Sequence, residues 1–193
     1  MPRVKLFDES EVLTKAMHLF WKQGYAATSV QDLVSHLGIN RASLYDTFGD
    51  KEQLFKKSFE LYRKTNIEGL KQFLNSQMDV REGFAKLFQN AIEEAINDKD
   101  RKGCFVVNTT AELVPNDESI SEVLESNKNE FEQIFLDYLE KGQEEGQIGK
   151  GRDLKSIAAL FYTLYNGLRV VSKVQPDKKK LSDTIGVALS LLD

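Results

Sequence analysis

The sequence has one cysteine, two histidines and three prolines, and these shortages exclude several classes of protein. A lone Cys104 cannot form a disulfide within the chain, and it leaves no cysteine-based zinc site. The histidines, His18 and His36, lie too far apart in the sequence to suggest a metal centre. We therefore expect neither a metal nor a cofactor.

Long apolar runs are also missing. The first ten residues, MPRVKLFDES, lack the apolar core of a signal peptide. The longest apolar stretch, 157–165, is about half the length that crosses a bilayer. Because the cysteine content also suits a reducing compartment, we expect a cytoplasmic protein without membrane contact.

The net charge of −4 does not by itself favour binding to nucleic acid, but the distribution of charge along the chain does. Residues 1–64 carry 10 Lys/Arg and 8 Asp/Glu, a balance of +2, whereas residues 65–193 carry 16 and 22, a balance of −6. A weakly basic front and an acidic back are consistent with a DNA-binding domain followed by a body that does not touch DNA.

Apolar residues recur at helical spacing along most of the chain, and strand-like alternation is scarce. We predict an all-α fold of about nine helices. Capping residues mark the first three: Asp8, Ser29 and Asn40 begin them, and Gly24 and Gly38 end the first two. The predicted ranges are 9–23, 30–36, 41–47, 50–75, 80–97, 103–114, 118–145, 153–174 and 178–192.

Two of the short helices form a helix-turn-helix at residues 29–48, joined by Leu37-Gly38-Ile39. The turn needs a glycine because the backbone reverses sharply there. The second helix exposes polar residues near its start, as a helix that enters the major groove does. We predict a DNA-binding domain at 1–50 and a helical body at 51–193.

The stretch from Ala16 to Phe55 resembles the TetR family of bacterial transcriptional regulators. The resemblance implies an all-helical homodimer that binds double-stranded operator DNA and takes a small-molecule effector in its C-terminal body. The matching positions are Leu19-Phe20, Gly24-Tyr25, Thr28-Ser29-Val30, Leu33, Leu37-Gly38-Ile39, Ser43-Leu44-Tyr45, Phe48, Lys51 and Leu54-Phe55.

The resemblance also implies which residues contact DNA. The residues that the resemblance assigns to contacts with the DNA phosphates or sugar-phosphate backbone are Thr28, Ser29, Tyr45 and Lys51. The residues that it assigns to base reading are Asn40, Arg41 and Ser43. We assign guanine to Arg41, because a guanidinium can bond both acceptors on the edge of that base.

Four of these residues also have a simpler interpretation. Ser29 and Asn40 can serve only as helix caps, Tyr45 can pack against Phe48, and Lys51 can be an ordinary surface lysine.

Apolar residues at spacings of three and four in 153–174 and in the last helix predict broad apolar faces. In the TetR family the last two helices pair with their symmetry mates as a four-helix bundle, which implies a homodimer; the alternative is that these faces complete the core of one chain. The residues are Ile157, Leu160, Phe161, Leu164, Leu168 and Val171, then Leu181, Ile185, Leu189 and Leu192.

The body is rich in aromatic residues, and ligand pockets are mostly apolar with a few polar anchors. Ordinary core packing is the alternative for every candidate. The candidate effector residues are Phe88, Cys104, Phe105, Asn108, Phe135, Phe161, Tyr162, Tyr165 and Lys173.

Cys104 lies at the start of a predicted helix, two residues after Lys102, and helix N-termini and nearby cations favour the thiolate form of a cysteine. Residues 103–108 resemble a subgroup of the family that senses reactive electrophiles, in which Lys173 also has a counterpart. The alternative is that Cys104 is a small buried apolar residue.

No Ser-His-Asp set, metal cluster or phosphate-binding glycine loop occurs, so we do not expect an enzyme. A helical protein-interaction module that has lost DNA binding is the alternative function, and the retained Arg41, Tyr45 and Lys51 argue against it. The expected function is that of a transcriptional repressor. Its dimer is expected to exist in two conformations, one that binds the operator and one that does not, and the effector favours the second.

Overall fold

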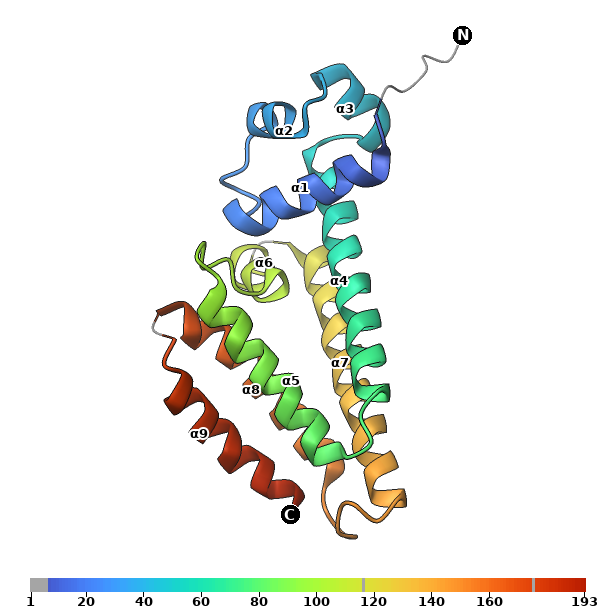
Figure 1. The fold of residues 1–193 in the computed structure, drawn as a ribbon. Helices are drawn as coiled ribbons and strands as arrows, with labels where there is room; N and C mark the ends of the chain where they lie inside the picture. Colours follow the sequence, from blue (N-terminus) through green and yellow to red (C-terminus); the bar gives the residue numbers. More distant parts are fainter. Residues whose placement is uncertain (1–6, 116, 175) are drawn as a thin grey trace. The chain divides into compact units, whose positions relative to one another are not determined.

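The computed structural model describes residues 7–115, 117–174 and 176–193, and within these ranges the chain forms nine α-helices and one short 3-10 helix, with no strand (Figure 1). The all-α prediction is confirmed. Residues 1–6, from which part of the signal-peptide inference comes, lie outside the described ranges. The helices are α1 Glu9–Gln23, α2 Val30–Leu37, α3 Arg41–Phe48, α4 Lys51–Asn75, α5 Val80–Asn97, α6 Phe105–Leu113, α7 Glu118–Glu144, α8 Leu154–Val174 and α9 Lys178–Leu189, followed by the 3-10 helix Ser190–Leu192.

The helix boundaries agree with the predicted ranges to within two residues, except at the C-terminal end of the last helix. That helix ends at Leu189 and continues as the 3-10 turn. Helix α6 begins at Phe105 rather than at 103, because Arg101 and Gly103 adopt left-handed backbone angles, with φ of 51° and 64°. A left-handed residue cannot continue into a right-handed helix.

The chain divides into two compact units, the first ending at Thr65 and the second beginning at Asn66. The first unit therefore extends past the boundary placed at residue 50. The reason is that the first half of α4 belongs to the core of the first unit. The Phe55 ring packs edge-on against Phe20 with centroids 5.2 Å apart, and Tyr62 packs against Trp21 at 5.0 Å.

The second unit has its core where α5, α7 and α8 meet. The fully buried ring of Phe84 packs edge-on against three others, at 4.8 Å from Phe161, 5.2 Å from Phe135 and 5.4 Å from Tyr138. Helix α9 packs against α5 and closes the core with Ile185 and other apolar residues. These buried rings supply much of the hydrophobic stabilisation of the unit.

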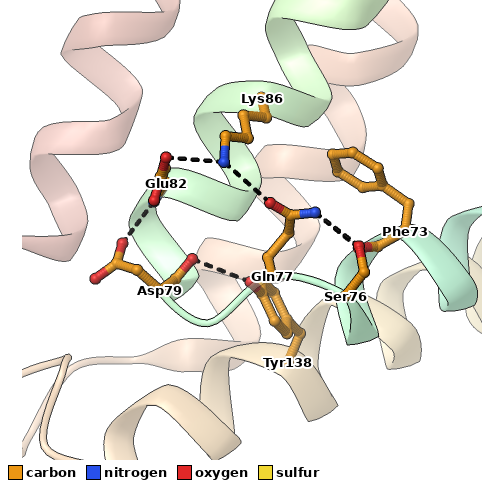
Figure 2. Close-up of polar contacts among 7 residues, drawn as sticks. All are labelled: Phe73, Ser76, Gln77, Asp79, Glu82, Lys86 and Tyr138. Atoms are coloured by element: carbon orange, nitrogen blue, oxygen red, sulfur yellow. Dashed lines mark hydrogen bonds and ion pairs between the residues drawn. The ribbon is translucent and has the colours of Figure 1, made fainter.

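A polar network holds the turn between α4 and α5 (Figure 2). The Tyr138 hydroxyl donates to the backbone carbonyl of Asp79 at 3.1 Å, while the Asp79 side chain caps α5 by accepting from the N–H of Glu82 at 2.7 Å. From the turn before α8, the Gln147 side chain accepts from the N–H of Val80 and donates to the carbonyl of Met78. The network satisfies the N–H groups of Val80 and Glu82, which lie in the first turn of α5 and have no helical partner.

The predicted apolar residues of α8 and α9 divide between the core and the surface. Most of them, including Phe161, Leu168 and Leu189, are buried within this one chain, whereas Leu160 and Val171 are exposed. The exposed apolar strip consists of Leu160, Val170, Val171 and Val174 on α8, Val187 on α9 and Leu191 in the 3-10 turn. Helix α8 is apolar on more than one face, so periodicity alone does not separate its core side from its exposed side.

Candidate nucleic-acid interface

The first helix of the motif, α2, begins at a complete capping box. The Ser29 hydroxyl accepts from the N–H of Asp32 at 3.1 Å, and the Asp32 carboxylate accepts from the N–H of Ser29 at 2.9 Å. The hydrogen bond from the Ser29 hydroxyl, at 2.6 Å, and the one from its N–H hold the pKa of Asp32 below the usual value. Ser29 is therefore a cap, as its simpler interpretation predicted, and it is also exposed.

The turn between the two motif helices uses a left-handed glycine. Gly38 has φ 68° and ψ 22°, and its N–H donates to the carbonyl of Val34 at 3.1 Å. The flanking Leu37 and Ile39 are buried and anchor the turn in the core of the first unit. A side chain at position 38 would strain the backbone, since residues with a Cβ rarely adopt this conformation.

The second motif helix, α3, has one buried side and one exposed side. Asn40 caps it by accepting from the N–H of Ser43 at 2.8 Å, and Leu44 and Phe48 anchor it in the core. The exposed residues form two pairs, and the members of each pair are four positions apart in the sequence. Residues with this spacing share one side of a helix. They are Arg41, Ala42, Tyr45 and Asp46.

Of the predicted base-reading residues, Asn40 and Arg41 are exposed, whereas Ser43 is half-buried. Tyr45 is 43% exposed, so part of this side chain is accessible from outside the first unit. The structure therefore places Asn40, Arg41 and Tyr45 together at the surface of α3, where a nucleic acid can reach them.

Thr28 and Lys51 are both engaged within the first unit. Thr28 is fully buried, and its hydroxyl donates to the carbonyl of Gly24 at 2.6 Å, so its only hydroxyl proton is already used. The ammonium nitrogen of Lys51 lies 4.3 Å from the centre of the Tyr25 ring, a cation–π contact that sequence reasoning did not foresee. Lys51 is thus held near the motif rather than being an unconstrained surface lysine.

Sequence reasoning missed Lys57. Its Nζ donates to the carbonyl oxygen of Phe48 at 3.2 Å and so contacts the last residue of α3. A cation at this position also opposes the negative end of the helix dipole.

The candidate effector residues lie in the second unit, and several of them surround Tyr165. The Tyr165 ring lies 6.2 Å from that of Phe88 and 6.5 Å from those of Phe131 and Phe135. Burial raises the pKa of Tyr165 and of Tyr162 above the usual value of a phenol. Phe88, Phe105, Phe135 and Phe161 are core residues, as the alternative predicted.

A polar chain runs past Cys104. Lys173 Nζ donates to Asn108 Oδ1 at 2.7 Å, and the Asn108 amide donates to the carbonyl of Lys102 at 2.8 Å. Cys104 itself is buried, at 8% exposure, at the position before α6. Thr109 is also buried nearby along α6, and its hydroxyl has no hydrogen-bond partner among the described residues.

Known families match both units. Residues 12–57 match "Bacterial regulatory proteins, tetR family", and residues 81–186 match "Tetracyclin repressor-like, C-terminal domain". The chain is a member of the TetR family. The TetR-type helix-turn-helix makes it a DNA-binding transcriptional regulator.

Two bacterial transcriptional regulators are similar to this chain over all or nearly all of its length. The uncharacterized HTH-type transcriptional regulator YezE of Bacillus subtilis is 33% identical over 100% of both chains. The HTH-type transcriptional repressor ComR of Escherichia coli is 30% identical over 98% of this chain and 90% of its own. A solved structure of the TetR-family regulator CifR, a cysteine mutant in complex with 26-bp operator DNA, has a TM-score of 0.87 at 26% identity, covering 99% of this chain and 100% of that one.

The described ranges offer neither a metal-binding cluster nor a membrane-spanning helix. They contain no group of three or more His, Cys, Asp or Glu side chains that could hold a metal ion. No helix among them is long and apolar enough to span a lipid bilayer.

Proposed function

We propose that this TetR-family protein is a homodimeric cytoplasmic repressor, and that each protomer reads one half of a two-fold-symmetric operator with α3. The observation that carries the proposal is the surface of α3. Its inner side is anchored by Leu44 and Phe48, and its outer side presents Arg41 and Tyr45 on a capped helix. A rigid helix with polar groups near its N-terminus suits the major groove.

The contacts that we propose divide into two groups. Arg41 and Asn40 read bases, and Ser43 supports them from the first turn of α3. Tyr45 and Lys51 hold the sugar-phosphate backbone, which positions the protein without reading sequence. Ser29 joins them only if its hydroxyl or its N–H leaves the Asp32 carboxylate, to which both donate in the capping box. Thr28 joins this second group only if its hydroxyl turns away from the Gly24 carbonyl, so we expect it to contribute least.

The test is selection of bound duplexes from a random pool, followed by titration of the enriched sequence. Arg41→Ala is expected to weaken specific binding by about 1–3 kcal/mol and to relax the preference at one base pair. Arg81→Ala is the matched control, because Arg81 is an exposed arginine of the second unit, paired with Asp193. Equal operator affinity of the Arg41→Ala variant and the parent contradicts the proposed reading.

The exposed apolar strip on α8 and α9 supports the homodimer. Val171 and Val187 are 56% and 74% exposed, which is costly for aliphatic side chains unless a partner covers them. An operator with two half-sites also calls for a two-fold dimer. Light scattering is expected to give a dimer for the parent and a monomer for Val171→Glu combined with Val187→Glu. Met78→Glu is the control, since Met78 is exposed but lies in the turn between α4 and α5.

We propose that the effector binds in the second unit beside Tyr162, Tyr165 and the Lys173–Asn108 pair. The buried hydroxyl of Thr109 supports this, because a ligand can satisfy a polar atom that the protein leaves unpaired. Helix α4 supplies core residues to both units, so a ligand that favours one packing of α4 changes the population of DNA-binding dimers.

Because Cys104 is the only cysteine, its role as a reactive sensor can be tested cleanly. N-ethylmaleimide is expected to weaken operator binding of the parent and to leave Cys104→Ser unaffected. If both respond alike, the thiol is not the sensor, and the effector binds without covalent attachment.

A further inference from the structure

Asp46 is an exposed residue in the last turn of α3, one turn after Ala42 and on the same side of the helix. Among the acidic side chains described in residues 7–65, it alone makes no hydrogen bond or ion pair. Asp8, Asp32 and Asp50 cap helices; Glu11, Glu52 and Glu60 pair with cations; and Glu9 interacts with another group.

The position is also locally unfavourable for a carboxylate. The C-terminal end of a helix carries partial negative charge, and α3 has no basic residue in its last turn. The residues three and four positions away are Ala42, Ser43, Gly49 and Asp50, none of which is a cation. Lys57 lies at this end of α3, but it donates to the Phe48 carbonyl and forms no ion pair with Asp46. No pairing described in the first unit therefore accounts for an acid at this position, and departures from local preference concentrate at functional positions.

On the DNA-facing side of α3, a carboxylate has few possible partners. It is repelled by phosphate, and it can only accept hydrogen bonds. The major-groove donors are the amino groups of cytosine and adenine. The adenine amino group lies next to the N7 acceptor, which repels a carboxylate, whereas the cytosine amino group has no acceptor beside it on its own base. Cytosine is therefore the base that suits Asp46.

We propose that Asp46 is a specificity-determining residue that accepts a hydrogen bond from the N4 amino group of one cytosine in each half-site. The same charge penalises every sequence that lacks a donor at that place, because the carboxylate then loses water and gains only phosphate repulsion. Asp46 thus sharpens selection by weakening non-cognate binding. This inference rests on the proposed function, in which α3 reads the operator.

The experiment compares the parent with Asp46→Asn, which keeps the shape of the side chain and removes its charge. Binding is measured to the selected operator, to the same operator with the proposed cytosine changed to thymine, and to a random duplex. The cytosine-to-thymine change is expected to weaken the parent about tenfold and the variant less than about threefold. Asp46→Asn is also expected to bind the random duplex more tightly, since one repulsive charge is gone.

Glu52→Gln is the matched control, because Glu52 is an exposed acid at the start of α4 with the same charge. It is expected to leave the ratio of operator to random binding unchanged. Thermal unfolding checks that both variants fold. Asp46→Asn is expected to be at least as stable as the parent, because it removes a carboxylate from the negative end of the α3 dipole.

The outcomes separate this inference from the proposed function. If Asp46→Asn selects the same operator with the same specificity ratio, while Arg41→Ala loses it, then Asp46 is a solvated surface residue and the inference alone fails. If the parent enriches no sequence from the random pool, both the inference and the proposed function are overturned.

Discussion

Lys57 and Phe48 join α4 to the end of α3: Lys57 Nζ donates to the Phe48 carbonyl at 3.2 Å and lies 5.8 Å from the centre of the Phe48 ring. The carbonyl at the end of α3 would otherwise lack a helical partner. Because the Phe48 ring is buried, this contact couples the direction of α3 to the core of the first unit.

Lys57→Met is expected to weaken operator binding about threefold to tenfold, because it removes one charge-assisted hydrogen bond that positions α3. The salt dependence of binding is expected to stay the same, since Lys57 acts on the protein and not on phosphate. Titrations at several salt concentrations check this. A slope that falls by about one in the variant shows instead that Lys57 contacts DNA. Lys56→Met, which removes a neighbouring surface lysine paired with Glu52, is the control.

Asn40 has two assigned roles, as the N-cap of α3 and as a base reader, and two variants separate them. Asn40→Ala removes the cap and is expected to destabilise the protein by about 0.5–2 kcal/mol. Asn40→Ser keeps a capping oxygen and the stability but loses the amide, so operator affinity is expected to fall. Thermal unfolding and operator titration measure the two effects. Parent-like binding by Asn40→Ser shows that Asn40 is only a cap.

Gly83 on α5 leaves room for the side chain of Tyr138. A Cβ at position 83 would lie 3.0 Å from Tyr138 Cζ and closer still to its hydroxyl. Gly83→Ala is therefore expected to destabilise the protein by about 1–3 kcal/mol, measured by chemical denaturation. In the Tyr138→Phe background the added cost is expected to be smaller, because the hydroxyl is gone. Additive costs contradict this packing.

Burial, together with the nearby carboxylates of Asp79, Glu145 and Glu82, raises the pKa of Tyr138 to about 12, and burial is the largest of these causes. The folded state thus holds the phenol proton more tightly than the unfolded state, in which the pKa is about 10. The stability that Tyr138 contributes is fully present below pH about 10 and is lost as pH rises towards about 12. The difference in free energy of unfolding between the parent and Tyr138→Phe is expected to shrink over this window; a constant difference contradicts the shift.

The parts of the fold that local chemistry specifies could be predicted from the sequence. Ser29 and Asn40 are strong N-caps, and Gly38 suits the left-handed residue of the turn, so the motif helices were predicted to within one residue. The shared core of α1 and α4 was not predicted, because the pairing of Phe20 with Phe55 depends on distant packing. This is why the first unit extends to Thr65.

In the candidate interface, too, some features follow from local sequence and others depend on distant packing. The exposure of Arg41 and Tyr45 follows from helical periodicity, since Leu44 and Phe48 must face the core. The burial of Thr28 and the contact of Lys57 with Phe48 carry no signal in the sequence. The first depends on how the helices of the first unit pack around Thr28, and the second depends on where the last carbonyl of α3 lies. On α8, Phe161 and Val171 are both apolar, and only the position of α5 and α7 makes the first a core residue and the second a surface residue.

The most direct test of DNA reading by α3 is the affinity of the full chain for its selected operator and for a random duplex of equal length, across a range of salt concentrations. The proposed function predicts that both affinities fall as salt rises, and that the operator stays about 10³-fold or more tighter at physiological salt. Equal affinity for the two duplexes at every salt concentration would contradict it.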